Sequence, residues 1–300
     1  RVIAMDLRGH GRSDNPSGSY SMTQIQADLL ALVDGLQVSG KVVLIGHSFG
    51  GGGWMWRPQV EAFSPDYHCL VPDLPEQGRS RAVSPFTIQS AAAQMADLIR
   101  SRAHGGQAHV VGLSLGAQVL VSLLSQNPDL VRRAIVSSAI VRPLSGMSWI
   151  SPGIIGASYN LFMAPLKNSD WWINLNRKYA AGVPAEYAAQ FKSEFQGETR
   201  DGFTHIMLEN LAFRLPSGLE KVTAPTLVVV GQKEYGAMRQ SARDLAAAIP
   251  TARAYTVAHQ RRMSLAEEHN WNMTAPSLFN AMLKDWLDGR PLPGDFMPLS

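Results

Sequence analysis

The sequence predicts an α/β fold, with a mostly parallel sheet flanked by helices and an inserted helical lid. From residue 41 onward, short apolar runs of strand length alternate with stretches of helix length, a pattern typical of parallel strands joined by crossover helices. The alternation stops after residue 138 and resumes at residue 223. We therefore expect a core built from residues 41–138 and 223–300, with residues 139–222 inserted between its two halves.

The core elements are expected where apolar runs and helical stretches follow one another. The runs predicted as strands cover residues 42–46, 67–71, 109–112, 133–137, 226–230 and 254–257. The stretches between them predict helices over residues 55–63, 87–102, 115–125, 238–248 and 275–287. The helix over residues 115–125 is apolar almost throughout, so we expect it to be buried.

The inserted segment is rich in prolines and aromatic residues and contains short amphipathic helices such as residues 201–213. Its aromatic residues include Trp149, Tyr159, Phe162, Trp171, Trp172 and Tyr179. An insert of this kind after a strand is typical of a lid over a site at the carboxyl ends of the strands. The alternative is a surface insert whose aromatics seal only its own small core.

Charge, cysteine content and motifs exclude several classes of partner. The chain has 27 Lys and Arg against 24 Asp and Glu, a formal net charge of +3, and its basic residues are scattered, so no nucleic-acid partner is expected. The single cysteine, Cys69, excludes an internal disulfide and offers no zinc site. Because no G-x-G-x-x-G, G-x-x-x-x-G-K-[ST] or H-E-x-x-H motif occurs, we expect no cofactor and no metal.

The longest uncharged stretch, residues 143–166, is long enough to be considered as a membrane span. It contains Pro143, Pro152 and Pro165 together with several serines, so we interpret it as part of a pocket cover and expect no span. No secretory signal is visible, and we expect a cytoplasmic protein. Homo-oligomerisation is compatible with the sequence.

One pattern occurs twice along the chain. Residues 6–13 (DLRGHGRS), a helical stretch and residues 46–50 (GHSFG) are echoed by residues 73–80 (DLPEQGRS), another helical stretch and residues 112–116 (GLSLG). Each G-x-S-x-G follows an apolar run, the context in which this motif places a nucleophilic serine on a tight turn. The sequence therefore offers two candidate nucleophiles, Ser48 and Ser114.

The residues after each serine favour Ser114. A working turn of this kind needs a helix that starts directly after the serine, because the helix N-terminus stabilises negative charge there. Ser114 is followed by an apolar helical stretch, whereas Ser48 is followed by Phe49 and four glycines. At about 1 kcal/mol per glycine relative to alanine, a helix after Ser48 would lose about 3 to 4 kcal/mol. The alternatives are that Ser48 is a second nucleophile, or that Ser114 is a small turn residue without chemistry.

Over residues 41–300 the chain resembles the α/β-hydrolase superfamily. The resemblance rests on the order and identity of residues 47–56 (HSFGGGGWMW), 73–74 with 78–80, 112–116, 225–231 (PTLVVVG) and 269–271 (HNW). It implies a nucleophile, an acid and a histidine in that order along the chain. It also implies an oxyanion loop after the first core strand, where His47 and Ser48 stand in place of the usual His-Gly pair. We expect the backbone N–H groups of Phe49 and Leu115 to form the oxyanion hole.

A serine needs a base to take its proton, and the base needs a carboxylate to hold it. His269 lies before the last predicted helix and is the expected base, with His259 as the rival. Glu234 follows the strand at residues 226–230 and is the expected acid, with Asp201 or another carboxylate of the inserted segment as the alternative.

The expected function is that of a serine hydrolase, carboxylesterase-like, cleaving a small carboxylic ester or related acyl compound through an acyl-enzyme. Relatives that open carbon–halogen or epoxide bonds use an aspartate at the position of this serine, which disfavours those reactions here. The alternative is a non-catalytic module of the same fold that binds a small ligand. We expect substrate contacts from His47, Trp54, Trp149 and Trp271.

The first forty residues look like the strand, loop and helix that lead into a second nucleophile turn. Our hypothesis is that the chain joins pieces of two related hydrolases, with residues 1–40 as a partial extension and residues 41–51 shared between two roles. The apolar residues 2–5 predict a strand that either covers an edge of the sheet or pairs with another molecule.

Overall fold

The structure is a computed structural model that describes residues 51–143, 146, 149–258 and 262–299 and the backbone of residues 41–45. Before residue 41 it describes only residues 8, 12–14, 16, 20, 21, 23–25, 27, 28 and 31. The predicted strand at residues 2–5 and most of the predicted extension at residues 1–40 lie outside the described residues. So do His47, Ser48, Phe49 and His259.

The described residues form one seven-stranded sheet in the order β2-β1-β3-β4-β5-β6-β7, with the last strand antiparallel and the others parallel. The strands are β1 (Lys41–Ile45), β2 (Tyr67–Leu70), β3 (Ala108–Leu113), β4 (Val131–Ser137), β5 (Thr226–Gly231), β6 (Ala252–Val257) and β7 (Phe296–Pro298). The predicted mostly parallel sheet is confirmed, and each predicted strand lies within two residues of its expected bounds. The short β7 was not predicted, because a three-residue run ending in proline carries no strand periodicity.

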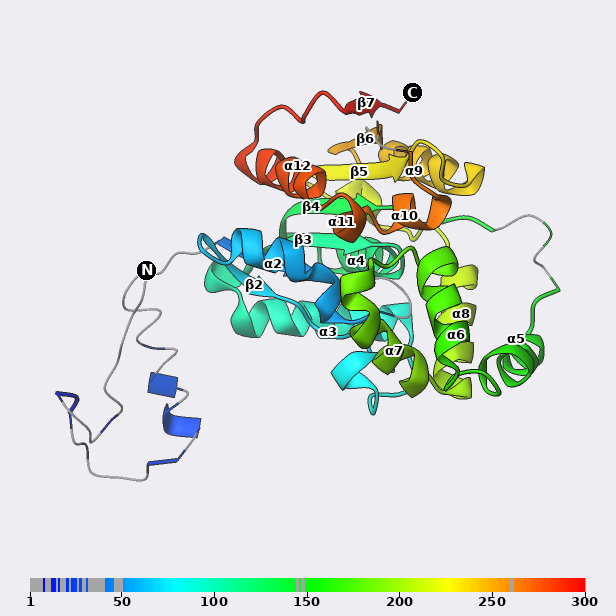
Figure 1. Ribbon diagram of the computed structural model, residues 1–300. Helices are drawn as coiled ribbons and strands as arrows, with labels where there is room; N and C mark the ends of the chain where they lie inside the picture. The colour runs from blue at the N-terminus through cyan, green and yellow to red at the C-terminus, as the bar shows by residue number, and fades with distance from the viewer. Residues whose placement is uncertain are drawn as a thin grey trace.

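Helices cover both faces of the sheet. One face carries α3 (Ile88–Arg102), α4 (Leu115–Gln126) and α9 (Gly236–Ala248), and the other carries α2 (Arg57–Phe63), α11 (Trp271–Thr274) and α12 (Pro276–Asp288). Figure 1 shows α2, α11 and α12 in front of the sheet. Successive residues of β5 alternate between the two cores, with Val228 and Val230 in the first and Leu227 and Val229 in the second. A sheet buried on both faces explains why its strands read as continuous apolar runs.

The helix that follows Ser114 is the most deeply buried of the core. Residues of α4 from Leu115 to Leu124 are all buried, as its sequence predicted. Replacing a buried leucine such as Leu120 or Leu123 with alanine typically costs about 2 to 5 kcal/mol of stability. The turn before α4 is therefore held by a helix that has little freedom to move.

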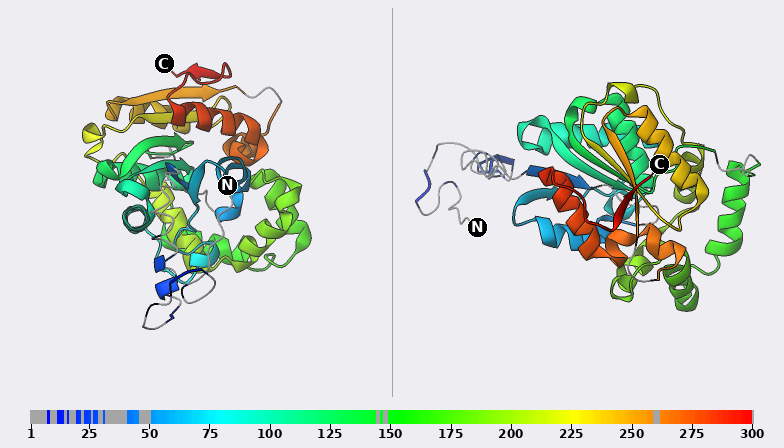
Figure 2. Two further views of the ribbon diagram at one scale, coloured as in Figure 1. Left: turned by 90° about the vertical axis from the view of Figure 1, so that its left-hand side faces the viewer. Right: turned by 90° about the horizontal axis from the view of Figure 1, so that it is seen from above.

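The inserted residues form α5 (Pro152–Ser158), α6 (Asp170–Leu175), α7 (Ala188–Gly197) and α8 (Arg200–Ala212), with π-helical turns at Tyr159–Met163 and Asn176–Ala180. Figures 1 and 2 show these helices grouped to one side of the sheet, with α5 outermost. The helix expected over residues 201–213 is α8. No helix among the described residues has the length and apolar character that crossing a membrane requires.

Candidate active site

Ser114 lies on a sharp turn between β3 and α4. Its backbone has φ 56° and ψ −117°, a left-handed conformation that costs a non-glycine residue about 1 to 3 kcal/mol. The Ser114 N–H donates to the carbonyl of Ser137 at 2.9 Å, which ties the turn to the end of β4. Gly112 permits the tight approach of strand and helix, because a Cβ there would lie 2.5 Å from the carbonyl oxygen of Gly116. This close approach accounts for the first glycine of the motif.

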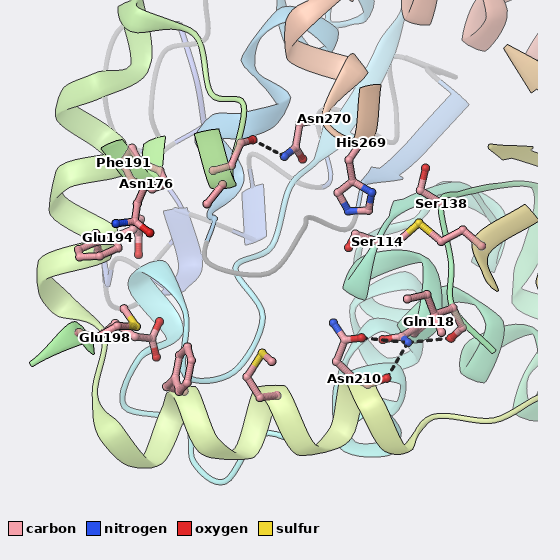
Figure 3. A pocket seen from close by; sticks show the side chains of 18 residues that line it. Ser114, Gln118, Ser138, Asn176, Phe191, Glu194, Glu198, Asn210, His269 and Asn270 are labelled. Carbon is pink, nitrogen blue, oxygen red and sulfur yellow. Dashed lines mark hydrogen bonds between the residues drawn. The ribbon is translucent and has the colours of Figure 1, made fainter. Parts of the chain in front are cut away.

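Glu234 and His269 form a buried hydrogen-bonded pair. Glu234 lies in the turn between β5 and α9 and is 1% exposed, and its Oε1 is 2.7 Å from Nδ1 of His269. The other carboxylate oxygen, Oε2, accepts the Gly231 N–H at 2.8 Å and the Ser138 hydroxyl at 2.8 Å. Because both oxygens of the Glu234 carboxylate make hydrogen bonds, the carboxylate fixes the orientation of the His269 ring. Figure 3 shows the His269 ring lying beside the Ser114 hydroxyl.

The helix that carries His269 is anchored to the turn that carries Glu234. That helix, α10 (Leu265–His269), begins with a capping box between Ser264 and Glu267. The buried Glu268 accepts the backbone N–H of Lys233 at 2.9 Å. Ser138 and Glu268 were not among the predicted site residues. The signal for Ser138 was its position directly after a predicted strand, at the edge of the sheet where site residues gather.

Leu115 is the first residue of α4, so its backbone N–H lies among those that the helix leaves without an intrahelical partner. The predicted second donor, Phe49, lies outside the described residues. The segment that follows Phe49 is anchored by Asp73, whose Oδ1 accepts the Gly53 N–H at 2.8 Å. The Oδ2 atom of Asp73 accepts the Arg79 N–H at 3.0 Å. Asp73 therefore joins the glycine-rich segment to the loop after β2.

Asp73→Ala is expected to lower kcat about tenfold with little change in KM, less than the roughly 10²- to 10³-fold loss of an oxyanion donor itself. The reason is that Asp73 acts through the backbone of the segment that follows Phe49 and contacts no substrate group. Steady-state kinetics on a short-chain chromogenic ester measure the effect. The exposed Asp66→Ala is the control, and an unchanged kcat in Asp73→Ala would contradict this role.

Ser114, Ser138 and His269 line one end of a cavity of about 510 Å³. Most of the other lining residues belong to the inserted segment, among them Met163, Asn176, Phe191, Glu194, Phe195, Glu198, Phe203, Met207 and Asn210. Gln118, one turn of α4 beyond Ser114, donates from Nε2 to the Asn210 carbonyl at 3.1 Å and so joins α4 to α8. Among the described residues, no group of three or more His, Cys, Asp or Glu side chains could hold a metal ion.

The three tryptophans expected to contact a substrate, Trp54, Trp149 and Trp271, do not line this cavity. Trp271 is fully buried and donates from Nε1 to the Ser137 hydroxyl at 3.1 Å, so it supports the strand end that holds Ser114. Trp149 is 64% exposed, and Trp54 packs against Tyr187.

The two carboxylates considered for the acid, Asp201 and Glu234, lie in different surroundings. Asp201 lies in the first turn of α8 with an exposed side chain near Arg200, so it does not share the surroundings of His269. Glu234 is the carboxylate that lies against His269. Its role, like those of Ser114 and His269, stays a prediction about chemistry.

Two family models match the chain. One, described as the alpha/beta hydrolase fold, covers residues 49–158, and the other, described as the alpha/beta hydrolase family, covers residues 1–52. A stretch of 52 residues is 56% identical to a non-heme chloroperoxidase of Streptomyces lividans, spanning 17% of this chain and 18% of that protein. The N-terminal residues are thus a partial duplicate of the same family pattern.

Longer similarities cover most of the chain. An AB hydrolase superfamily protein of Gibberella zeae is 28% identical over 237 residues, which is 77% of this chain and 74% of the relative. The crystal structure of the enol-lactonase from Burkholderia xenovorans LB400 has the same fold, with a TM-score of 0.63 at 21% identity over 83% of this chain and 92% of that chain. Together with the parallel sheet and its motifs, these similarities place the chain in the α/β-hydrolase superfamily, as a hydrolase of that fold.

Proposed function

We propose that the chain is a serine hydrolase that cleaves a small carboxylic ester through an acyl-enzyme intermediate. Ser114 is the nucleophile, His269 the general base and acid, and Glu234 the carboxylate that orients His269. The observation that carries the proposal is the Glu234–His269 pair, 2.7 Å apart and beside a serine on a left-handed turn.

In the first half-reaction, the Ser114 hydroxyl oxygen attacks the ester carbonyl carbon while Nε2 of His269 takes the hydroxyl proton. The backbone N–H groups of Leu115 and Phe49 stabilise the negative oxygen that forms. The carbon–oxygen bond to the alcohol then breaks, and His269 returns its proton to the leaving alcohol. In the second half-reaction, His269 removes a proton from water, the resulting hydroxide attacks the acyl group, and the acid leaves as Ser114 is reprotonated.

The inserted residues 139–222 act as the lid in this proposal. They supply Met163, Phe191, Phe195, Phe203 and Met207 to the cavity wall, which suits the hydrocarbon part of a small ester. The volume of about 510 Å³ lies within the roughly 300 to 1,000 Å³ of small-molecule sites.

Covalent labelling tests the proposal directly. An alkyl fluorophosphonate is expected to add once to the protein, and peptide mass spectrometry is expected to place the adduct on Ser114 and not on Ser48. The physical reason is that only an activated serine reacts with this reagent at a useful rate. An adduct on Ser48, or neither an adduct nor ester turnover while small esters still bind, would overturn the proposal in favour of another site or a binding module.

A further inference from the structure

One face of α7 is turned toward the cavity. Phe191, Glu194, Phe195 and the residue that ends the helix, Glu198, all line it. Their spacing of three, four and seven residues places them on one side of a helix. Figure 3 shows Glu194 and Glu198 across the cavity from Ser114 and His269. The cavity therefore has a second polar end, away from the proposed chemistry.

Glu198 has an unmet hydrogen-bonding capacity at this end. Its side chain is buried, with 9% of the residue exposed, and Oε1 has no hydrogen-bond partner. The residue is held in place through its backbone, since the Tyr159 hydroxyl donates to the Glu198 carbonyl at 2.7 Å. A buried carboxyl oxygen without a donor is unfavourable. A ligand group that donates a hydrogen bond would remove that cost.

Arg81 acts electrostatically on Glu198 but hydrogen-bonds to Glu194 instead. Arg81 donates to Glu194 at 2.7 Å, and Glu76 accepts hydrogen bonds from Ser84, the Phe86 N–H and His205. Burial raises the pKa of Glu198 to about 7; Glu76 and Glu194 add to that rise, and Arg81 and a hydrogen bond from the backbone of Thr199 oppose it. Burial also raises the pKa of Glu194.

The cavity wall as a whole is suited to a cation. Among the described residues that line it there are two glutamates and no lysine or arginine, although the chain carries a formal net charge of +3. Three phenylalanines, Phe191, Phe195 and Phe203, lie in the same wall. Aromatic faces attract ammonium groups, and a carboxylate beside them accepts the ammonium hydrogen bonds.

We propose that the Glu198 end of the cavity binds an ammonium group, so that the substrates are carboxylic esters that carry an amine away from the scissile bond. This inference rests on the proposed hydrolase function for the position of the ester group. The ammonium site itself depends only on Glu198, Glu194 and the aromatic wall.

Binding to an inactive variant tests the site independently of catalysis. In Ser114→Ala protein at pH 8, calorimetry is expected to show that hexylammonium binds about tenfold or more tightly than 1-hexanol. The reason is that a hydrogen bond between charged groups raises binding affinity by about that factor. Adding Glu198→Gln, which keeps the side-chain shape, is expected to abolish the preference, whereas adding the exposed Glu61→Gln is expected to keep it. Equal binding of the two ligands, or a preference that survives Glu198→Gln, overturns the proposal.

The preference for hexylammonium over 1-hexanol is also expected to weaken as the pH falls from 8 to 5.5. The amine stays protonated over this range because its pKa is near 10. Glu198 becomes neutral as the pH passes below about 7, so the attraction is present above that pH and is lost beneath it. Protonation of Glu194 acts in the same direction. A preference that stays constant over this range would contradict the assignment to Glu198.

A pair of ethyl esters connects the site to catalysis. For the otherwise unsubstituted protein at pH 8, kcat/KM for ethyl 6-aminohexanoate is expected to exceed that for ethyl heptanoate, and Glu198→Gln is expected to lower this ratio about tenfold. Because both esters undergo the same chemical step, the ratio of their kcat/KM values cancels any effect on that step. Turnover of both esters at equal rates overturns the ammonium site and leaves the hydrolase intact. No turnover of either, with the binding preference present, overturns the hydrolase and leaves the ammonium site.

Discussion

Ser114→Ala is expected to lower kcat on a short-chain chromogenic ester by roughly 10⁶-fold, the loss seen when an activated serine is removed from a catalytic triad. The residual rate would come from binding and from the backbone donors at the start of α4. The measurement is steady-state hydrolysis of 4-nitrophenyl butyrate. Such a loss requires that the hydroxyl on the turn after β3 is the atom that attacks the ester.

The duplicated motif provides the control for this experiment. Ser48→Ala is expected to retain turnover, because the glycines after Ser48 cannot supply the buried helix that supports Ser114. If Ser48→Ala abolished turnover while Ser114→Ala retained it, the nucleophile would be assigned to the wrong copy.

A second substitution separates loss of chemistry from loss of folding. Ser114 has φ 56°, a conformation that glycine adopts without the strain that serine bears. Ser114→Gly is therefore expected to be at least as stable as the unsubstituted protein in thermal unfolding and equally inactive as Ser114→Ala. If Ser114 is catalytic, we expect its hydroxyl to be retained even though the strained backbone lowers the stability of the protein. Lower stability in Ser114→Gly would show that this serine supports the fold through its side chain.

The core could be predicted because the central strands β3 and β5 are buried along their whole length and the longer core helices are periodic. β5 illustrates this, since all of its residues are buried and its apolar run was unmistakable. The positions of Ser114 and Glu234 followed in turn, because each comes directly after such a strand. Parallel strands end at one edge of the sheet, which is why residues far apart in sequence could be expected to meet.

The cavity wall was harder to predict because it depends on how the inserted helices turn. Trp149 and Phe191 are both aromatic residues of the insert, yet Trp149 is 64% exposed and Phe191 is buried against the cavity. Residue type alone does not distinguish them. Trp271 neighbours His269 in sequence, but it lies at the start of a new helix and its side chain is buried against Ser137 of β4.

The spacing of α7 would have identified Glu194 and Glu198 as facing the same way as Phe191 and Phe195. That signal existed in the sequence. This spacing was not used because two glutamates on one side of a helix usually indicate a solvent-exposed face. Only the position of α7 beside the strand ends shows that this face is covered.

Glu234→Gln is expected to lower kcat by roughly 10⁴-fold, although the side chain keeps its size and position. The surroundings of Oε2 explain why the effect is so large. That oxygen accepts the Gly231 N–H and the Ser138 hydroxyl, so a glutamine must place its carbonyl oxygen there. Its NH₂ group is then left facing Nδ1 of His269.

An amide donor at that position reverses the tautomer of His269. Nδ1 must accept the new hydrogen bond, so the imidazole proton moves to Nε2, the atom that has to take the proton of Ser114. The variant therefore retains a folded site with an imidazole in the unreactive form.

Glu234→Asp, which keeps the charge but shortens the reach to the imidazole, is expected to retain more activity than Glu234→Gln. Proton NMR of His269, with the labile proton on Nδ1 in the unsubstituted protein and on Nε2 in Glu234→Gln, tests this account separately from rate. A wild-type tautomer in an inactive Glu234→Gln protein would show that Glu234 acts through its charge alone.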